Sequence, residues 1–244
     1  MKKHIPNIIT LLNLISGVSG IISAMNGHWE LAFWLMIAGA GFDFFDGMVA
    51  RLLKVSGPLG AQLDSLSDMV TFGVLPSIIM YNMLLNSPTP IVSYELMDVR
   101  VFPMIAFVIA AMSGFRLAKF NIDDRQTSSF IGLPTPANAL FIGALSFATY
   151  STTCNCPEFN QLISNAYVLG GLSIVLSYLL VAELPLFALK FKNLTWNDNK
   201  IRYIFLSISV LLLVVFYQWM YMAILIIIPL YVLMSITNNL LSKK

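Results

Sequence analysis

Four aspartates stand close together in an otherwise apolar stretch of the chain. Asp43 and Asp46 are three residues apart, and Asp64 and Asp68 are four residues apart. Residues at these spacings lie on one face of a helix, so each pair would present two carboxylates together. An ionised acid within a membrane is costly unless it is paired or hydrated, and Arg51 alone cannot pair with all four. One or two divalent cations would balance this charge.

Carboxylate ligands limit which metal ions could bind here and which reactions those ions could support. Carboxylate oxygens suit Mg²⁺, Mn²⁺ or Ca²⁺, and the stretch contains no His or Cys, which argues against Zn²⁺. Sites of the Mg²⁺ type commonly bind phosphate and stabilise displacement at phosphorus. Arg51 could add charge-assisted hydrogen bonds to phosphate, and the small residues Gly47 and Ala50 would leave room for a ligand or for close helix packing. The alternative is a hydrated helix end in which the acids balance Arg51 and Lys54.

The composition places these acids in a membrane protein. Of the 244 residues, 58% are hydrophobic and 11% are charged, and the mean hydropathy is +0.80, whereas soluble domains have about 25% charged residues. The apolar runs are continuous and do not alternate, which excludes a transmembrane β-barrel. We therefore expect an all-α polytopic bundle, forming a single domain over residues 1–244. About eight transmembrane helices are predicted, near residues 5–24, 30–54, 59–85, 101–120, 132–150, 165–189, 201–217 and 220–236.

The basic residues predict the orientation of this bundle. With eight spans and a cytoplasmic N-terminus, every Lys and Arg except Arg100 falls on the cytoplasmic side, as the positive-inside rule requires. Both termini are then cytoplasmic, and the four aspartates lie at the cytoplasmic mouth of the bundle. We interpret the apolar run up to Ala24 as a retained first helix and not as a cleaved signal. A site at this boundary suits a lipid with a phosphorylated head, and no nucleic-acid partner is expected.

Two further features have simple interpretations. Cys154 and Cys156 are separated by one residue, a spacing that strains a disulfide, and we interpret them as incidental loop thiols. Glu183 lies near the inner end of the sixth predicted helix. It is expected to be hydrated or to pair with Lys190 or Lys192.

The acidic stretch resembles the signature of the CDP-alcohol phosphatidyltransferases. It matches all eight fixed positions of that signature with their gaps, namely Asp43, Asp46, Gly47, Ala50, Arg51, Gly60, Asp64 and Asp68. Other segments resemble the branch of this family that makes phosphatidylserine. These segments are Pro6 to Asn13, Ser67 to Pro76, Phe115 to Asn121 and Phe130 to Pro136. The resemblance covers roughly residues 5 to 140, and the helices over about 165–240 are additional.

The resemblance implies a homodimeric helix bundle in the cell (inner) membrane, with one or two divalent ions, Mg²⁺ or Mn²⁺, and Ca²⁺ as a possible substitute. It implies that L-serine displaces CMP from CDP-diacylglycerol and gives phosphatidylserine. All four aspartates would ligate metal, and Asp68 would also be the general base that takes the proton of the attacking hydroxyl. The nucleotide and diphosphate would be held by Asn7, Thr10, Gly47, Ala50, Arg51 and Gly60. For Asn7 a helix cap, and for Thr10 an interhelical hydrogen bond, is the alternative role.

The acceptor side rests on fewer residues. The carboxylate of serine needs a cation, and Arg116, with Lys119 and Asn121 close by, is the candidate. The alternative is that Arg116 and Lys119 are ordinary positive-inside residues. The same basic residues could also serve glycerol 3-phosphate or inositol phosphate as acceptor. A divalent-cation transporter is the non-enzyme alternative, although transporters tend to place their acids near the bilayer midplane.

Overall fold

The computed structural model describes residues 4–55, 57–90, 95–96, 99–122, 129–150, 157–187 and 195–242. Helices dominate this part of the chain, and short strands pair in two antiparallel ribbons. The helices are α1 (Ile5–Met25), α2 (Trp29–Leu53), α3 (Pro58–Asp68), the π-helix η2 (Met69–Val74), α4 (Leu75–Leu85), η3 (Phe102–Ala106), α5 (Phe107–Ile122), α6 (Thr135–Tyr150), α7 (Pro157–Ile163), α8 (Ala166–Val181), α9 (Trp196–Val215), η4 (Tyr217–Trp219) and α10 (Met220–Ser242). The strands are β1 (Glu95–Leu96), β2 (Val99–Arg100), β3 (Ser129–Ile131) and β4 (Pro185–Phe187).

The predicted all-helical membrane fold is confirmed, because five of the described helices are long and apolar enough to cross a bilayer. They are α1, α2, the continuous helix α3–η2–α4, the helix η3–α5, and the helix η4–α10. The protein is therefore an integral membrane protein. Each of the eight predicted segments contains a helix, but α6 and α8 have only 16 residues each. The number of spans and the side of each terminus stay predictions.

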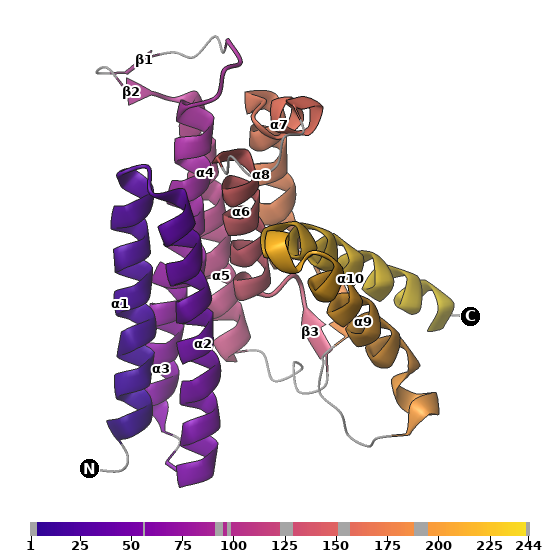
Figure 1. The fold of residues 1–244 in the computed structure, drawn as a ribbon. Coiled ribbons are helices and arrows are strands. Elements are labelled where there is room, and N and C mark those ends of the chain that lie inside the picture. The colour runs from indigo at the N-terminus through magenta and orange to yellow at the C-terminus, as the bar shows by residue number, and fades with distance from the viewer. Residues whose placement is uncertain are drawn as a thin grey trace.

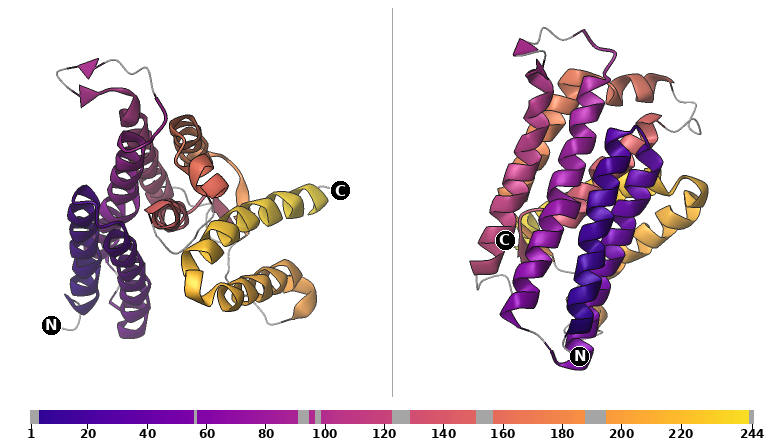
Figure 2. Two further views of the ribbon diagram at one scale, coloured as in Figure 1. Left: turned by 45° about the horizontal axis from the view of Figure 1, so that its top comes forward. Right: turned by 90° about the vertical axis from the view of Figure 1, so that its left-hand side faces the viewer.

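Helices α1 to α6 and α8 run side by side in one bundle, and the pair α9–α10 leans away from it (Figure 1 and Figure 2). The N-terminus and the turn between α2 and α3 lie at one end of the bundle, and β1–β2 lies at the other (Figure 1). Two hydrogen bonds attach α10 to β4. The Tyr231 hydroxyl donates to the carbonyl of Phe187 at 2.9 Å, and the Asn239 amide donates to that of Pro185 at 2.5 Å.

The sixth predicted helix ends earlier than expected. It was predicted to continue to residue 189, but α8 ends at Val181 and the chain becomes extended. Pro185 disfavours a helical conformation at the residue before it, and the backbone that follows pairs with β3. Glu183 therefore lies in a connection and not on a helix.

Helix α1 turns its polar residues inward and its apolar residues outward. Thr10 and Asn13 are buried, whereas Ile8, Ile15 and Ile22 are all more than half exposed. A helix facing lipid has this pattern, because lipid solvates apolar side chains and polar groups must find partners within the bundle. The inward face of α1 is the face that packs on α2, α3 and η2.

Two glycines allow three backbones to meet at the centre of this packing. A Cβ atom on Gly17 of α1 would lie 2.9 Å from the Cα atom of Thr71 in η2. A Cβ atom on Gly39 of α2 would lie 2.6 Å from the Thr71 methyl carbon. Small residues at helix contacts let backbones approach closely, so Gly17 and Gly39 fix the spacing of α1 and α2 around η2.

Replacing Gly17 by leucine is expected to destabilise the protein by about 1–3 kcal/mol or more, because the new side chain overlaps the η2 backbone. The melting temperature in detergent measures this loss. Gly171→Leu on α8 is the control, because a Cβ atom there meets nothing within 4 Å. Equal melting temperatures for the two variants would contradict this packing.

Candidate metal and nucleotide site

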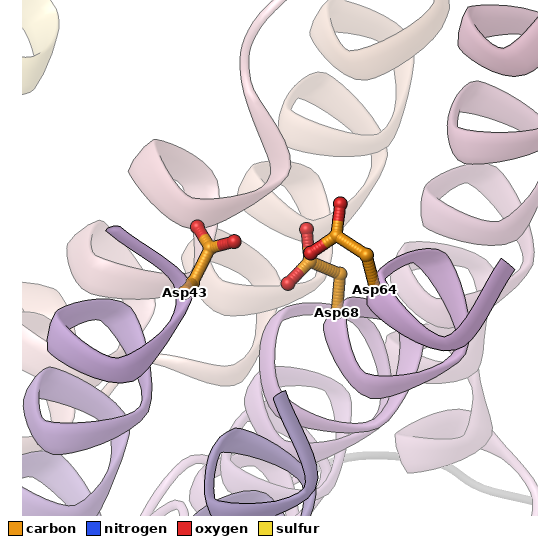
Figure 3. A group of neighbouring side chains, drawn as sticks. All are labelled: Asp43, Asp64 and Asp68. Carbon is orange, nitrogen blue, oxygen red and sulfur yellow. The ribbon is translucent and has the colours of Figure 1, made fainter. Parts of the chain in front are cut away.

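Three of the four aspartates converge at the end of the bundle where α2 and α3 meet. Asp43 projects from α2, and Asp64 and Asp68 project from α3 toward it (Figure 3). One carboxylate oxygen of each lies within 4.8 Å of those of the other two. The two-helix hairpin thus joins the acids that are separate in the sequence into one cluster.

The fourth aspartate has a different environment. Asp46 is buried with 6% of its surface exposed, and the Thr10 hydroxyl donates a 2.6 Å hydrogen bond to its Oδ2 atom. It is not part of the group whose oxygens lie within 4.8 Å of one another. Thr10 therefore makes an interhelical hydrogen bond, and the bond orients one oxygen of Asp46.

The donor set of the cluster fits a hard divalent cation. Three carboxylates at this distance repel one another when ionised, and partial burial strengthens the repulsion. The Oδ1 atom of Asp64 is buried and has no hydrogen-bond donor among the described residues. A divalent ion would neutralise the group and satisfy this oxygen, and an all-oxygen set suits Mg²⁺, Mn²⁺ or Ca²⁺. Asp43, Asp64 and Asp68 are the residues that could hold it.

A cavity of about 180 Å³ opens beside the cluster, between α1, α2 and α3. Asp46 and Asp64 border it, so an ion and a ligand in the cavity would be neighbours. Among the residues that line it are five of the six predicted nucleotide contacts, namely Asn7, Thr10, Gly47, Ala50 and Gly60.

The small residues keep this cavity open. A Cβ atom on Gly47 would meet nothing within 4 Å, and one on Gly60 would lie 3.5 Å from the Asn7 side-chain oxygen. The sixth predicted contact, Arg51, is exposed and is not among the lining residues. In this structure Arg51 stands outside the cavity wall.

Asn13 is a site residue to which the sequence assigned no role. Its amide nitrogen donates a 3.1 Å hydrogen bond to Oδ1 of Asp68, and the side chain is fully buried. Thr71 donates to the backbone carbonyl of Asn13 at 3.0 Å. The available signal was the spacing of Asn7, Thr10 and Asn13, which places three polar residues along one side of an apolar helix.

Arg116 on α5 is buried, with 8% of its surface exposed. Its Nη1 atom donates to the Thr135 hydroxyl at 3.3 Å, and its Nε atom has no partner among the described residues. Its guanidinium lies 6.0 Å from the centre of the Phe120 ring, and it interacts electrostatically with Asp68. A buried guanidinium with an unused donor beside the acidic cluster is suited to an anionic group.

The other two predicted acceptor residues are occupied elsewhere. Lys119 forms an ion pair with Glu183 at 3.4 Å, and that glutamate is 74% exposed. The Asn121 amide donates to the Ser65 hydroxyl at 2.9 Å. Glu183 thus has a partner that the sequence did not suggest, while the predicted partners Lys190 and Lys192 lie outside the described residues. Cys154 and Cys156 also lie outside them.

The fold and the site together define a membrane protein with a carboxylate cluster and a small cavity at one end of its helix bundle. The family model for CDP-alcohol phosphatidyltransferase matches residues 3–182. This chain belongs to the CDP-alcohol phosphatidyltransferase family, a family of phosphotransferase enzymes. Helices α9 and α10 lie beyond the matched residues.

Several curated proteins are similar to this chain in sequence. The CDP-diacylglycerol–serine O-phosphatidyltransferase of Bacillus subtilis is 36% identical over 149 residues, which are 61% of this chain and 78% of that protein. The protein of the same name from Methanocaldococcus jannaschii is 30% identical over 181 residues, or 74% and 72% of the two chains. The archaetidylserine synthase of Methanothermobacter thermautotrophicus is 30% identical over 175 residues, or 70% and 66%.

Proposed function

We propose that this enzyme transfers the phosphatidyl group of CDP-diacylglycerol to L-serine, giving phosphatidylserine and CMP. The observation that carries the proposal is the gathering of Asp43, Asp64 and Asp68 beside a cavity, in a chain of the CDP-alcohol phosphatidyltransferase family. Serine as acceptor is supported by the relatives, since the names of all three refer to serine.

The acids and the cavity would bind different parts of CDP-diacylglycerol. Asp43, Asp64 and Asp68, with Asp46 beside them, would hold one or two divalent ions, Mg²⁺ or Mn²⁺, and Ca²⁺ could substitute. When bound, such ions supply positive charge to the diphosphate and to the oxygen that leaves with CMP. Thr10 keeps Asp46 oriented toward the cavity by its hydrogen bond. Gly47, Ala50 and Gly60 leave room for the nucleotide, and Asn7 offers it a polar contact.

Asp68 is the general base of the proposed reaction. Its carboxylate takes the proton of the serine hydroxyl as the bond from that oxygen to the β-phosphorus forms. The bond between the β-phosphorus and the bridging oxygen breaks, and the oxygen leaves with CMP. The Asn13 amide donates to Oδ1 of Asp68, and we assign acceptance of the proton to the other oxygen, Oδ2.

Arg116 is the proposed partner of the serine carboxylate, since it is buried, retains an unused Nε–H and lies near Asp68. Arg116→Ala is expected to raise the KM for serine about 10- to 100-fold and to change the KM for CDP-diacylglycerol little, because charge-assisted hydrogen bonds are strong. Steady-state kinetics with each substrate varied in turn measures both constants.

Lys119→Ala is the matched control for Arg116, because Lys119 is a neighbouring cation that already pairs with Glu183. It should leave both KM values near those of the unmodified enzyme. Equal increases in the two KM values for Arg116→Ala would assign that residue a structural role instead.

The orientation and assembly of the protein are also proposals. Arg51 and Lys54 stand at the end of α2 that faces the same side as the N-terminus, and Arg100 in β2 stands at the opposite end (Figure 1). This asymmetry supports an active site that opens to the cytoplasm from the cell (inner) membrane, where serine and CMP are soluble. We propose a homodimer, as the family resemblance implies.

The function is tested by CMP release. Purified protein is incubated with CDP-diacylglycerol, Mn²⁺ or Mg²⁺, and in turn L-serine, glycerol 3-phosphate and inositol phosphate. Release with serine alone is expected. CMP release with glycerol 3-phosphate and not with serine would move the assignment to another acceptor. If none of the three alcohols supports CMP release, the transferase proposal is refuted.

A further inference from the structure

Asn13 and Thr71 form a buried bracket behind the proposed base. The Asn13 amide nitrogen donates to Asp68 Oδ1 at 3.1 Å, and the Thr71 hydroxyl donates to the backbone carbonyl of Asn13 at 3.0 Å. Neither Asn13 nor Thr71 has any exposed surface. The two bonds tie α1 to both sides of the junction between α3 and η2, where Asp68 is the last residue of α3.

The bracket is costly to the fold, which suggests that it serves another purpose. The Oδ1 atom of Asn13 is buried and has no hydrogen-bond donor among the described residues. An unsatisfied buried amide oxygen destabilises a protein. A Cβ atom on Gly39 would lie 3.0 Å from this oxygen, so the bundle also leaves room for the amide. An amide kept under these conditions needs a role beyond packing.

The backbone at the junction is unusual as well. Thr71 lies in the π-helix that begins immediately after Asp68. Single turns of π-helix within α-helices occur frequently at functional sites. Thr71 therefore braces Asn13 from the segment that directly follows Asp68.

We propose that Asn13 is a positioning residue, which holds the Asp68 carboxylate in the rotamer that presents Oδ2 to the acceptor hydroxyl, and that Thr71 braces Asn13 for this task. The inference rests on the proposed function, since it assumes that Asp68 is the base. A carboxylate without this bond would rotate among several orientations, and proton transfer requires a narrow range of them.

The test is the kinetics of Asn13→Leu, a change that preserves approximate shape and removes the donor. We expect kcat to fall about 10- to 100-fold, the range for loss of a hydrogen bond to a charged group. The KM values for serine and CDP-diacylglycerol should stay within about threefold. The melting temperature should change little, because loss of the unsatisfied Asn13 oxygen offsets loss of the bond to Asp68. Thr71→Val should also lower kcat, but by a smaller factor than Asn13→Leu does. Thr71→Ser, which keeps the hydroxyl, should have the kcat of the unmodified enzyme.

The matched control is Asn82→Leu. The Asn82 amide in α4 also donates to a backbone carbonyl of α1, that of Ala24 at 3.3 Å. Within the described residues it forms no hydrogen bond to the aspartates. This variant should keep kcat. The proposal would be overturned if Asn82→Leu lowered kcat as much as Asn13→Leu does. It would also be overturned if the fall in kcat in both Asn13→Leu and Thr71→Val came from loss of folded protein.

Binding of Mn²⁺ alone separates positioning of the base from support of the metal. Because Asp43 and Asp64 are unchanged, Asn13→Leu should still bind Mn²⁺, and loss of Mn²⁺ binding would overturn the assignment to the base. Failure of the inference is distinct from failure of the proposed function. An unmodified enzyme that releases no CMP with serine refutes the function, whereas an active enzyme with unchanged kcat in Asn13→Leu refutes this inference alone.

Discussion

Replacing Asp68 by asparagine is expected to lower kcat for CMP release by about 10²–10⁴-fold, the typical contribution of a positioned general base. Asparagine keeps the shape of the side chain but cannot take the proton of the serine hydroxyl. Binding of CDP-diacylglycerol should survive, because the residues that line the cavity are unchanged. Steady-state kinetics measures kcat, and an equilibrium binding experiment measures the affinity for CDP-diacylglycerol.

A matched pair of variants makes the Asp68 result specific. Glu183→Gln neutralises an acid that pairs with Lys119 outside the cluster, and it should leave kcat near that of the unmodified enzyme. Retained turnover in Asp68→Asn would remove this residue as the base. If the variant loses both turnover and the binding of CDP-diacylglycerol, Asp68 would instead be assigned to substrate binding.

Removal of divalent cations is the second large effect that we expect. Treatment with EDTA should lower CMP release by about 10³-fold or more, since metal charge at a transferring phosphoryl group contributes several kcal/mol. Added Mg²⁺ or Mn²⁺ should restore activity, because the cluster of Asp43, Asp64 and Asp68 offers only oxygen ligands. Activity is measured after dialysis and again across a titration of each metal.

The ligand assignment is tested by the metal concentration that gives half-maximal activity. Asp64→Asn and Asp43→Asn should raise this concentration at least tenfold, because each removes one charged ligand from the cluster. Glu183→Gln should not change it. Full activity in EDTA, or the same metal dependence in all three variants, would contradict a metal site at these acids.

The spacing of the acids predicted the central geometry of the site. Because residues i and i+4 share a helix face, Asp64 and Asp68 could be placed together, and the hairpin brought Asp43 to them. The glycine-lined cavity beside them also followed from the small residues at fixed gaps. Spacing did not distinguish Asp46, which turns to Thr10 on another helix.

The contacts that the sequence did not predict join residues far apart in the chain. Asn13 and Asp68 are 55 residues apart, and their bond depends on how α1 is rotated against α3. Lys119 and Glu183 meet across 64 residues because α8 ends at Val181 and the chain turns toward β3. Helical periodicity fixes which residues share a face, but not which neighbouring helix that face contacts.

The stoichiometry of the complete reaction tests the central claim most directly. Purified protein receives CDP-diacylglycerol, Mn²⁺ and labelled L-serine, and the CMP released and the label recovered in lipid are both quantified. We predict one labelled serine in phosphatidylserine for each CMP, with both products formed about 10²–10⁴-fold more slowly by Asp68→Asn. CMP release without label in the lipid would contradict serine as the acceptor.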